Sequence, residues 1–315
     1  MKRRDLAALF LLGALWGGSF LFIRIAAPSL GAFPLAAGRV VLAALILWLG
    51  LRAAGRRVEL RGRVRKLLVL GALNAAIPFS LIAVAELRLT ASLAAMLNAT
   101  VPLWASLFGA VWLGERLNAR RVAGLGLGVV GVAVLVGWSP VTLDEPTLLS
   151  IAATLVATCA YGLSGVWTKR QLSGVPAPTL ALGQQLGAAT WLIVPALWQA
   201  PAAHPTRPAV LAVVALAVLS TTVAYLLYFH LVASIGPTRT TTVTYLLPVF
   251  GMLWGAIFLH EPLTRGMLAG LALILGSVVL VNEVRVSALL PPAWRTTKPA
   301  RPRPPLETRT LECDA

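Results

Sequence analysis

The sequence predicts an all-α integral membrane protein, with ten transmembrane helices in two inverted-topology five-helix repeats. Three observations predict this fold: the composition, ten long apolar runs and an internal repeat. The 315 residues are 58% hydrophobic and only 12% charged, and their mean hydropathy is +0.83. In soluble domains about a quarter of the residues are charged, so a chain this apolar is expected in a lipid bilayer.

Ten apolar runs approach the roughly 20 residues that a helix needs to cross the hydrocarbon core of a bilayer. The connections between them carry helix breakers and charges, such as Pro28 and Pro34 after the first run and the basic stretch 55–66 after the second. The run centres lie near Leu15, Ala44, Pro78, Pro102, Val130, Tyr161, Ala189, Val218, Phe250 and Leu275. Ten helices leave little of the chain over, so no sheet is expected.

Basic residues alternate between the connections. The segment before the first run, the connection 52–66, the stretch 116–121 and the region after residue 284 are rich in Lys and Arg, whereas the intervening connections hold only Arg88, Arg207 and Arg265. Short loops rich in Lys and Arg stay in the cytoplasm. Both termini are therefore predicted to be cytoplasmic, and the Pro- and Arg-rich residues 287–315 are predicted to form a disordered basic cytoplasmic tail.

The formal net charge of +16 does not indicate nucleic acid as a partner, because Lys and Arg lie between apolar runs rather than along one face of a soluble domain. Cys159 and Cys313 give neither a disulfide framework nor a metal site. No cofactor or metal is expected. The basic start before an apolar run resembles a signal peptide, but its match to a later run predicts that it is retained.

A segment at residues 101–117 reappears in the same register at residues 247–263. The matched pairs are Pro102 with Pro248, Gly109 with Gly255 and Glu115 with Glu261 at an offset of 146, and Trp16 with Tyr161, Ser19 with Ser164 and Arg39 with Gln184 at an offset of 145. The chain thus divides into two five-helix halves, 5–138 and 147–286. Because five is odd, the second half enters the membrane from the opposite side, as in the inverted repeats of secondary transporters.

The segment Leu-Trp-Gly-Gly-Ser-Phe at 15–20, the helix start at 34–39 and the paired segments 102–115 and 248–261 resemble the drug/metabolite transporter superfamily, specifically its EamA-like family with two tandem five-helix repeats. The resemblance covers nearly the whole chain. It implies a multi-pass secondary transporter of the bacterial inner (cell) membrane that exports amino acids or related small metabolites by alternating access. It also implies a small-molecule substrate and contact with membrane lipids, but it does not choose the substrate. Coupling to protons is an expectation from the resemblance only, and facilitated diffusion is the open alternative.

Other functions remain open from the sequence. A multidrug efflux transporter is an alternative within transport. A cavity lined by acidic and aromatic residues would favour cationic drugs, but no acidic residue is expected in the interior here. A membrane scaffold or channel without transport activity is the alternative outside it. Gly162-Leu163-Ser164-Gly165 matches a short pattern of intramembrane proteases, but Ser164 is already explained as the repeat image of Ser19, so no catalytic residue is predicted.

Polar and aromatic side chains within the apolar runs are the candidates for a substrate-binding cavity, because buried amides and hydroxyls need partners in lipid. The candidates are Trp16, Ser19, Arg39, Asn74, Asn98, Trp104, Tyr161, Ser164, Gln184, Thr221, Tyr225 and Tyr245. Arg39 either binds a substrate carboxylate or extends outward to water. Pro102 and Pro248 are expected to kink their helices, either beside the cavity or for packing alone.

Glu115 and Glu261 follow the mid-run prolines by about 13 residues, which is roughly 20 Å along a helix and places both at the membrane edge. We therefore predict that they cap helix starts rather than carry protons, and Pro262 suits the first turn of such a helix. Glu86 and His230 are expected near helix ends within reach of water. No carboxylate is expected at mid-membrane.

Overall fold

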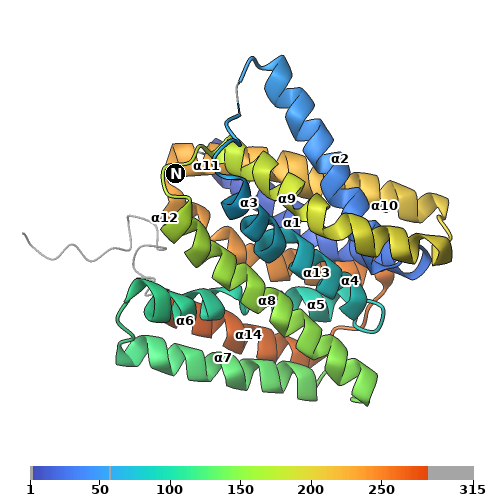
Figure 1. Ribbon diagram of the computed structural model, residues 1–315. Helices are drawn as coiled ribbons and strands as arrows, with labels where there is room; N and C mark the ends of the chain where they lie inside the picture. The colour runs from blue at the N-terminus through green and yellow to red at the C-terminus, as the bar shows by residue number, and fades with distance from the viewer. Residues whose placement is uncertain (1–2, 57, 283–315) are drawn as a thin grey trace, which may run out of the picture. The chain divides into compact units, whose positions relative to one another are not determined.

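The computed structural model describes residues 3–56 and 58–282, and every regular element within these ranges is helical (Figure 1). The elements in chain order are α1 (Arg3–Leu30), α2 (Ala32–Ala53), α3 (Val64–Gly71), η1 (Ala72–Ala76), α4 (Ile77–Ala85), α5 (Ala91–Asn98), α6 (Val101–Leu113), α7 (Ala119–Gly137), α8 (Glu145–Gln171), α9 (Ala177–Gln199), η2 (Ala200–Ala202), α10 (Arg207–Ala217), η3 (Val218–Val223), α11 (Ala224–Ile235), α12 (Pro237–Thr240), α13 (Val243–Leu259) and α14 (Arg265–Val281). The sequence from residue 283, including the predicted tail 287–315, lies outside the described residues.

Within the described residues, eight helical segments are long and apolar enough to cross a membrane. Three of them join several elements: Val64–Ala85 comprises α3, η1 and α4, Ala91–Leu113 comprises α5 and α6, and Arg207–Ile235 comprises α10, η3 and α11. Two further apolar helices, α13 and α14, have 17 residues each and are shorter than these spans. Each of the ten run centres predicted from the sequence falls within one of these ten segments.

Five helices begin at a polar capping residue. Thr90, Asn118, Asp144, Thr206 and Thr264 each accept a hydrogen bond, through the side chain, from the backbone N–H three residues later. Such a cap satisfies one of the four N–H groups that the first turn of a helix leaves without a partner. These caps fix where the spans start after their short connections.

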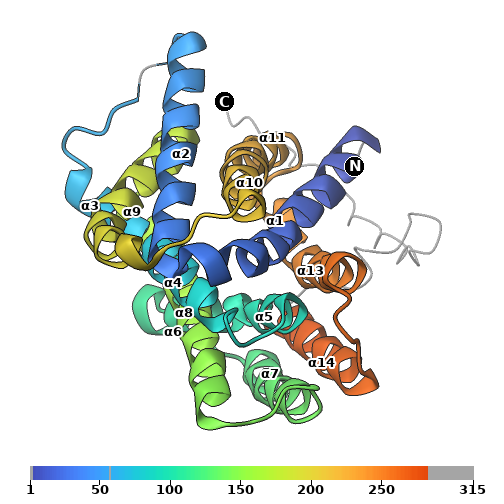
Figure 2. The same cartoon turned by 90° about the vertical axis from the view of Figure 1, so that its right-hand side faces the viewer.

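Small residues allow several helix backbones to approach closely, as is common where lipid supplies no hydrophobic drive between helices. A Cβ on Gly71 of α3 would lie 2.4 Å from the backbone nitrogen of Ala188 in α9, and one on Gly17 of α1 would lie 2.7 Å from that of Gly251 in α13. Figure 2 shows α7 beside α14, where a Cβ on Gly270 would meet the Leu135 backbone at 2.6 Å. These contacts leave no room for a side chain.

Two π-helical segments interrupt spans that the sequence predicts as continuous helices. η1 lies between α3 and α4, and η3 lies between α10 and α11, at the same offset of 146 that relates Pro102 to Pro248. In η3, the hydroxyls of Thr221 and Thr222 each donate to a carbonyl five residues earlier, at 2.9 Å. Such single wide turns often mark functional sites in helices.

Candidate functional site

A chain of polar side chains crosses the interior between four helical elements. The hydroxyl of Ser164 in α8 donates to Oδ1 of Asn74 in η1 at 2.8 Å, and Nδ2 of Asn74 donates to Oε1 of Gln184 in α9 at 2.8 Å. Nε2 of Gln184 then donates to the phenol of Tyr225 in α11. The chain joins elements from both sequence-matched halves, so a movement of one half would change the partners of these groups.

Arg39 of α2 lies beside this chain and does not extend to the surface, because it is only 5% exposed. Its Nε donates to the Thr221 hydroxyl of η3 at 3.0 Å, and its guanidinium carbon lies 3.7 Å from the ring centroid of Phe79. No carboxylate of residues 3–56 and 58–282 forms an ion pair with Arg39. The interior therefore holds a cation without an anionic partner.

Aromatic groups complete these surroundings. Tyr161 of α8 and Tyr225 lie within electrostatic range of Arg39. Trp16 of α1 packs edge-to-face on Tyr225 with a centroid distance of 6.5 Å, and its centroid lies 5.7 Å from that of Tyr228. We name these side chains together the Arg39 cluster, which consists of Trp16, Arg39, Asn74, Tyr161, Ser164, Gln184, Thr221 and Tyr225.

The other four cavity candidates make their polar contacts elsewhere. Trp104 of α6 donates to the Thr158 hydroxyl at 3.0 Å, and the phenol of Tyr245 accepts from Asn282 at 3.2 Å. The Ser19 hydroxyl donates to a carbonyl of its own helix, and Asn98 Oδ1 is buried with no hydrogen-bond partner among the described residues. The structure therefore brings eight of the twelve candidates together in the Arg39 cluster, and substrate binding by any of the twelve stays a prediction.

A pocket of about 1140 Å³ lies between α2, α9 and the connection at 55–60, and its lining includes Trp48, Arg52 and Leu182. None of the twelve candidates lines it. Tryptophan and arginine at a membrane-facing helix end are typical of the lipid interface, so this pocket is not the predicted substrate cavity.

Two buried or stacked residues escaped prediction, Phe79 next to Arg39 and Gln185 next to Gln184 in the chain. Phe79, which stacks under the guanidinium, looks in the sequence like any other apolar residue of its run. Gln185 is fully buried, and neither atom of its amide group has a hydrogen-bond partner in the described part of the chain. The sequence could have indicated Gln185, because it is a second amide next to Gln184 within an apolar run.

The two prolines lie differently in their helices. Helix α5 ends at Asn98 and α6 begins at Val101, so Pro102 lies in the first turn of α6, where a missing N–H removes no helical hydrogen bond. The prediction of a kink at Pro102 within one continuous helix is therefore wrong, because the helix is broken between α5 and α6. Pro248 lies inside α13 and is buried.

Glu261 caps a helix, but not the one predicted. Its two carboxylate oxygens accept from the backbone N–H groups of Ala91 and Ser92 at 2.7 and 2.8 Å, so it caps the start of α5. The helix expected to begin at Pro262 begins at Arg265. The first N–H groups of α5 have no partner within the helix, and a carboxylate at that end also meets the favourable end of the helix dipole.

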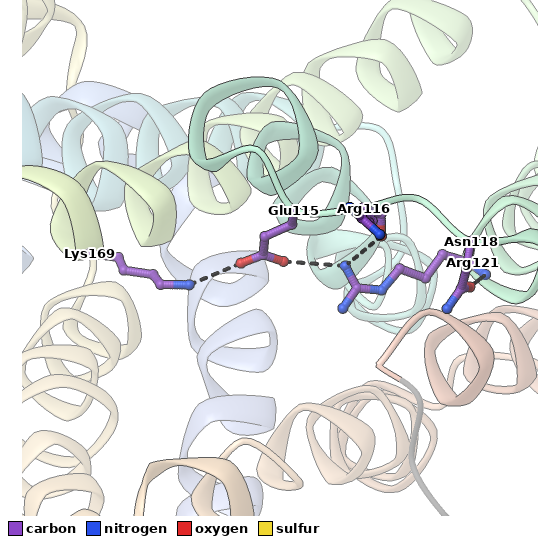
Figure 3. Close-up of polar contacts among 5 residues, drawn as sticks. All are labelled: Glu115, Arg116, Asn118, Arg121 and Lys169. Carbon is purple, nitrogen blue, oxygen red and sulfur yellow. Dashed lines mark hydrogen bonds and ion pairs between the residues drawn. The ribbon is translucent and has the colours of Figure 1, made fainter.

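Glu115 has different contacts from its repeat partner (Figure 3). Its carboxylate pairs with Lys169 Nζ of α8 at 2.9 Å and with Arg121 Nη1 of α7 at 3.3 Å. No backbone N–H of the described residues donates to it, so the predicted capping is not observed here. The hydrogen bond from Lys169 is the main cause that lowers the pKa of Glu115, and burial opposes it.

We expect Lys169→Met to raise the pKa of Glu115 towards the ordinary value, because its main donor is lost. The side chains of Lys169 and Glu115 are 65% and 35% exposed, so solvent screening should keep the loss of stability below about 1 kcal/mol. The stabilisation by an ionised Glu115 is present at neutral pH and is lost as the pH falls through its lowered pKa. Unfolding in detergent measured against pH tests this. If Lys169→Met lost as much stability on acidification as the wild type does, this prediction would be contradicted.

Glu86, expected within reach of water, is instead fully buried. It is 0% exposed, and neither carboxyl oxygen has a hydrogen-bond partner among the described residues. The sequence placed it correctly at a helix end, but Arg24 of α1 covers this turn and donates to the Glu86 carbonyl. His230 is exposed, as expected.

The described ranges contain no group of three or more His, Cys, Asp or Glu residues that could hold a metal ion. Cys159 of α8 is a free thiol. The Arg39 cluster offers a charge, hydrogen-bonding groups and aromatic faces.

Two stretches of the chain, residues 5–137 and 148–283, match the model of the EamA-like transporter family. The chain belongs to the EamA-like transporter family. The double match shows that the family domain is present twice, and the apolar helices show that this EamA-like transporter is a multi-pass membrane protein. Membership places it in a transporter family rather than in an enzyme class.

Relatives of this EamA-like transporter carry transporter names. The uncharacterized transporter YvbV of Bacillus subtilis is 30% identical over 58% of this chain, which spans only 59% of that relative's length. The uncharacterized inner membrane transporter YedA of Escherichia coli K12 is 25% identical over 87% of this chain and 89% of its own. A probable terminal-alkyne amino-acid exporter of Streptantibioticus cattleyicolor is 26% identical over 88% and 92%.

A protein of known crystal structure aligns with this EamA-like transporter at a TM-score of 0.63 and 21% identity, over 89% of this chain and 96% of that one. Identity this low shows the shared fold alone.

Proposed function

We propose that this EamA-like transporter is a secondary transporter of the bacterial inner membrane, and that it exports amino acids or related small metabolites carrying a carboxylate. The observation that carries the proposal is Arg39, a buried guanidinium without an anionic partner, surrounded by hydrogen-bonding and aromatic groups from both halves of the chain. Ionisable residues inside a membrane protein are costly and usually functional.

The chemistry of the Arg39 cluster suits a carboxylate. The Nε of Arg39 is used by Thr221, and its two Nη groups have no hydrogen bond to any described residue. The planar guanidinium can offer these donors to the oxygens of one carboxylate, and such charge-assisted bonds are about twice as strong as neutral ones. A cationic drug would be repelled by the same group, which makes multidrug efflux the weaker alternative.

The proposed mechanism is alternating access. All ten apolar segments would cross the membrane as two inverted five-helix halves, 5–138 and 147–286, with both termini in the cytoplasm. The double family match, the matched η1 and η3 and the alternation of basic connections support this arrangement. Asn74 of the first half would exchange its partners Ser164 and Gln184 of the second half as the halves move.

Counterflow in proteoliposomes tests the proposal. Vesicles loaded with a mixture of unlabelled amino acids should take up a labelled amino acid that is a substrate, and the uptake should saturate, because only an alternating carrier exchanges solute against solute. Empty vesicles and vesicles loaded with an organic cation are the controls. Unsaturable uptake would indicate a channel, counterflow of cations alone would indicate drug efflux, and no uptake of any solute would favour a scaffold.

A further inference from the structure

Three charged residues meet at one end of the bundle, and the proposed substrate site uses none of them. Arg24 comes from α1, Glu86 from the turn between α4 and α5, and Glu261 from the connection between α13 and α14. Glu86 and Glu261 are close enough for their charges to interact, and Arg24 interacts with Glu86. Arg88 of the same turn is exposed and interacts with Asp144 instead.

The two carboxyl groups have opposite surroundings. Glu261 accepts two hydrogen bonds from backbone N–H groups at the start of α5, at 2.7 and 2.8 Å. Glu86 is 0% exposed, and neither of its carboxyl oxygens has a hydrogen-bond partner in residues 3–56 and 58–282. The guanidinium of Arg24 donates to the backbone carbonyl of Glu86 rather than to its carboxyl group.

A carboxyl group in such surroundings is stable only when it is protonated. Ionising it would bury a second negative charge beside Glu261 without a hydrogen bond to offset the loss of water. Burial is the largest cause that raises the pKa of Glu86 well above its ordinary value. The charge of Glu261 raises it further, and Arg24 opposes both.

We propose that Glu86 is a proton-binding site through which the pH on its side of the membrane controls the closure of this end of the bundle. The proposal rests on the alternating access proposed above. In the structure Glu261 of one half holds the start of α5 in the other and Glu86 is buried, and we assign this arrangement to the closed form. Opening would separate these groups and admit water to Glu86, which would release its proton and pair with Arg24 through its carboxylate.

The direction of the pH effect follows from linkage. The closed form binds the proton more tightly than the open form, in which Glu86 has a pKa near the ordinary value of about 4.3. Low pH on this side therefore favours closure. As the pH rises between the ordinary and the raised pKa, the closed form is disfavoured about tenfold per pH unit. The proton is taken from and returned to the same side, so the site regulates the carrier and does not drive it.

The infrared difference spectrum between the wild type and Glu86→Gln, both in detergent, tests proton binding without any transport assay. A C=O stretch of a protonated carboxyl group should be present at neutral pH and should disappear in Glu86→Gln. The matched control is Glu59→Gln, because Glu59 is 83% exposed and pairs with Arg63, so this substitution should leave the band unchanged. A spectrum without such a band, or a band that survives in Glu86→Gln, overturns the proposal.

Thiol labelling tests the link to closure. Ser92→Cys, in a Cys159→Ser and Cys313→Ser background, places a probe at the start of α5, where Ser92 is fully buried. The rate of labelling by a membrane-impermeant maleimide is measured for the protein with Glu86 and for Glu86→Gln at each pH from about 5 to about 8. Dividing the first rate by the second removes the pH dependence of the thiol itself. This ratio should rise by up to about tenfold per pH unit. A constant ratio overturns the proposal.

The outcomes separate this inference from the proposed function. If counterflow fails for every solute while the infrared band and the rising ratio are found, the proton site stands and the transport proposal falls. If counterflow succeeds while the ratio stays constant, the carrier stands and Glu86 is merely a buried neutral carboxyl. Glu86→Gln keeps the shape of the protonated group, so it should fold, and a wild-type spectrum without the band overturns the proposal even if it does not.

Discussion

Arg39→Gln should abolish saturable counterflow at ordinary substrate concentrations while leaving the protein folded. Removing one partner of a buried charge pair costs about 3 kcal/mol, which raises the half-saturation concentration roughly 100-fold. Glutamine keeps a donor for Thr221, and the variant no longer buries an unpaired cation, so thermal unfolding should shift little or upward. The half-saturation concentration for an amino acid and the unfolding midpoint are the two measurements.

Arg39→Lys is the informative companion to this variant. It keeps the charge but loses the planar fork, and a compact ammonium loses the stacked arrangement on Phe79. An intermediate loss of affinity is expected. Unchanged affinity in both variants would show that Arg39 does not contact the substrate, and unfolding of both would give it a structural role instead.

Gly71→Leu is expected to lower the free energy of unfolding by about 3 kcal/mol or to prevent folding. Overpacking usually costs about 1–3 kcal/mol, and here the added Cβ would lie 2.4 Å from the backbone nitrogen of Ala188 and 2.5 Å from the backbone carbon of Gly187. Backbone atoms cannot turn away as a side chain does, so α3 would separate from α9. The yield of monodisperse protein and its unfolding midpoint in detergent measure the effect.

Gly126→Leu provides the matched control for this substitution. Gly126 is also helical, in α7, but a Cβ built there meets nothing within 4 Å. The same change should therefore alter stability by less than about 0.5 kcal/mol. Equal losses in both variants would mean that the close approach of α3 and α9 is not what requires glycine at position 71.

The sequence was sufficient for the helices because the signal for a membrane span is local. About 20 apolar residues between charged or proline-rich connections suffice to predict a span, and every predicted run centre lies in a helical segment. The π-helical η1 and η3 were not predictable in this way. In η3 the wide turn carries hydroxyl-to-carbonyl hydrogen bonds, such as that of Thr221, which hydropathy does not register.

The candidate site was predicted in part for a related reason. Polar residues in apolar runs must find partners, and that rule identified Asn74, Gln184 and Arg39. It could not say which partners they find: Trp104 satisfies the same requirement against Thr158 in helix packing. The errors at Glu86 and Glu261 have one origin, because burial and capping there depend on segments far away in the chain.

The wide turns of η1 and η3 each hold one residue more than an α-helical turn would. If such a turn tightened into an α-helix, the helix beyond it would rotate by about 100° and advance by about 1.5 Å. Asn74 and Thr221 lie on these two turns and bond to Gln184 and Arg39. A rotation of this kind would let polar groups change partners inside lipid while nearly all backbone hydrogen bonds of the span stay intact, so these spans need no unwound hinge.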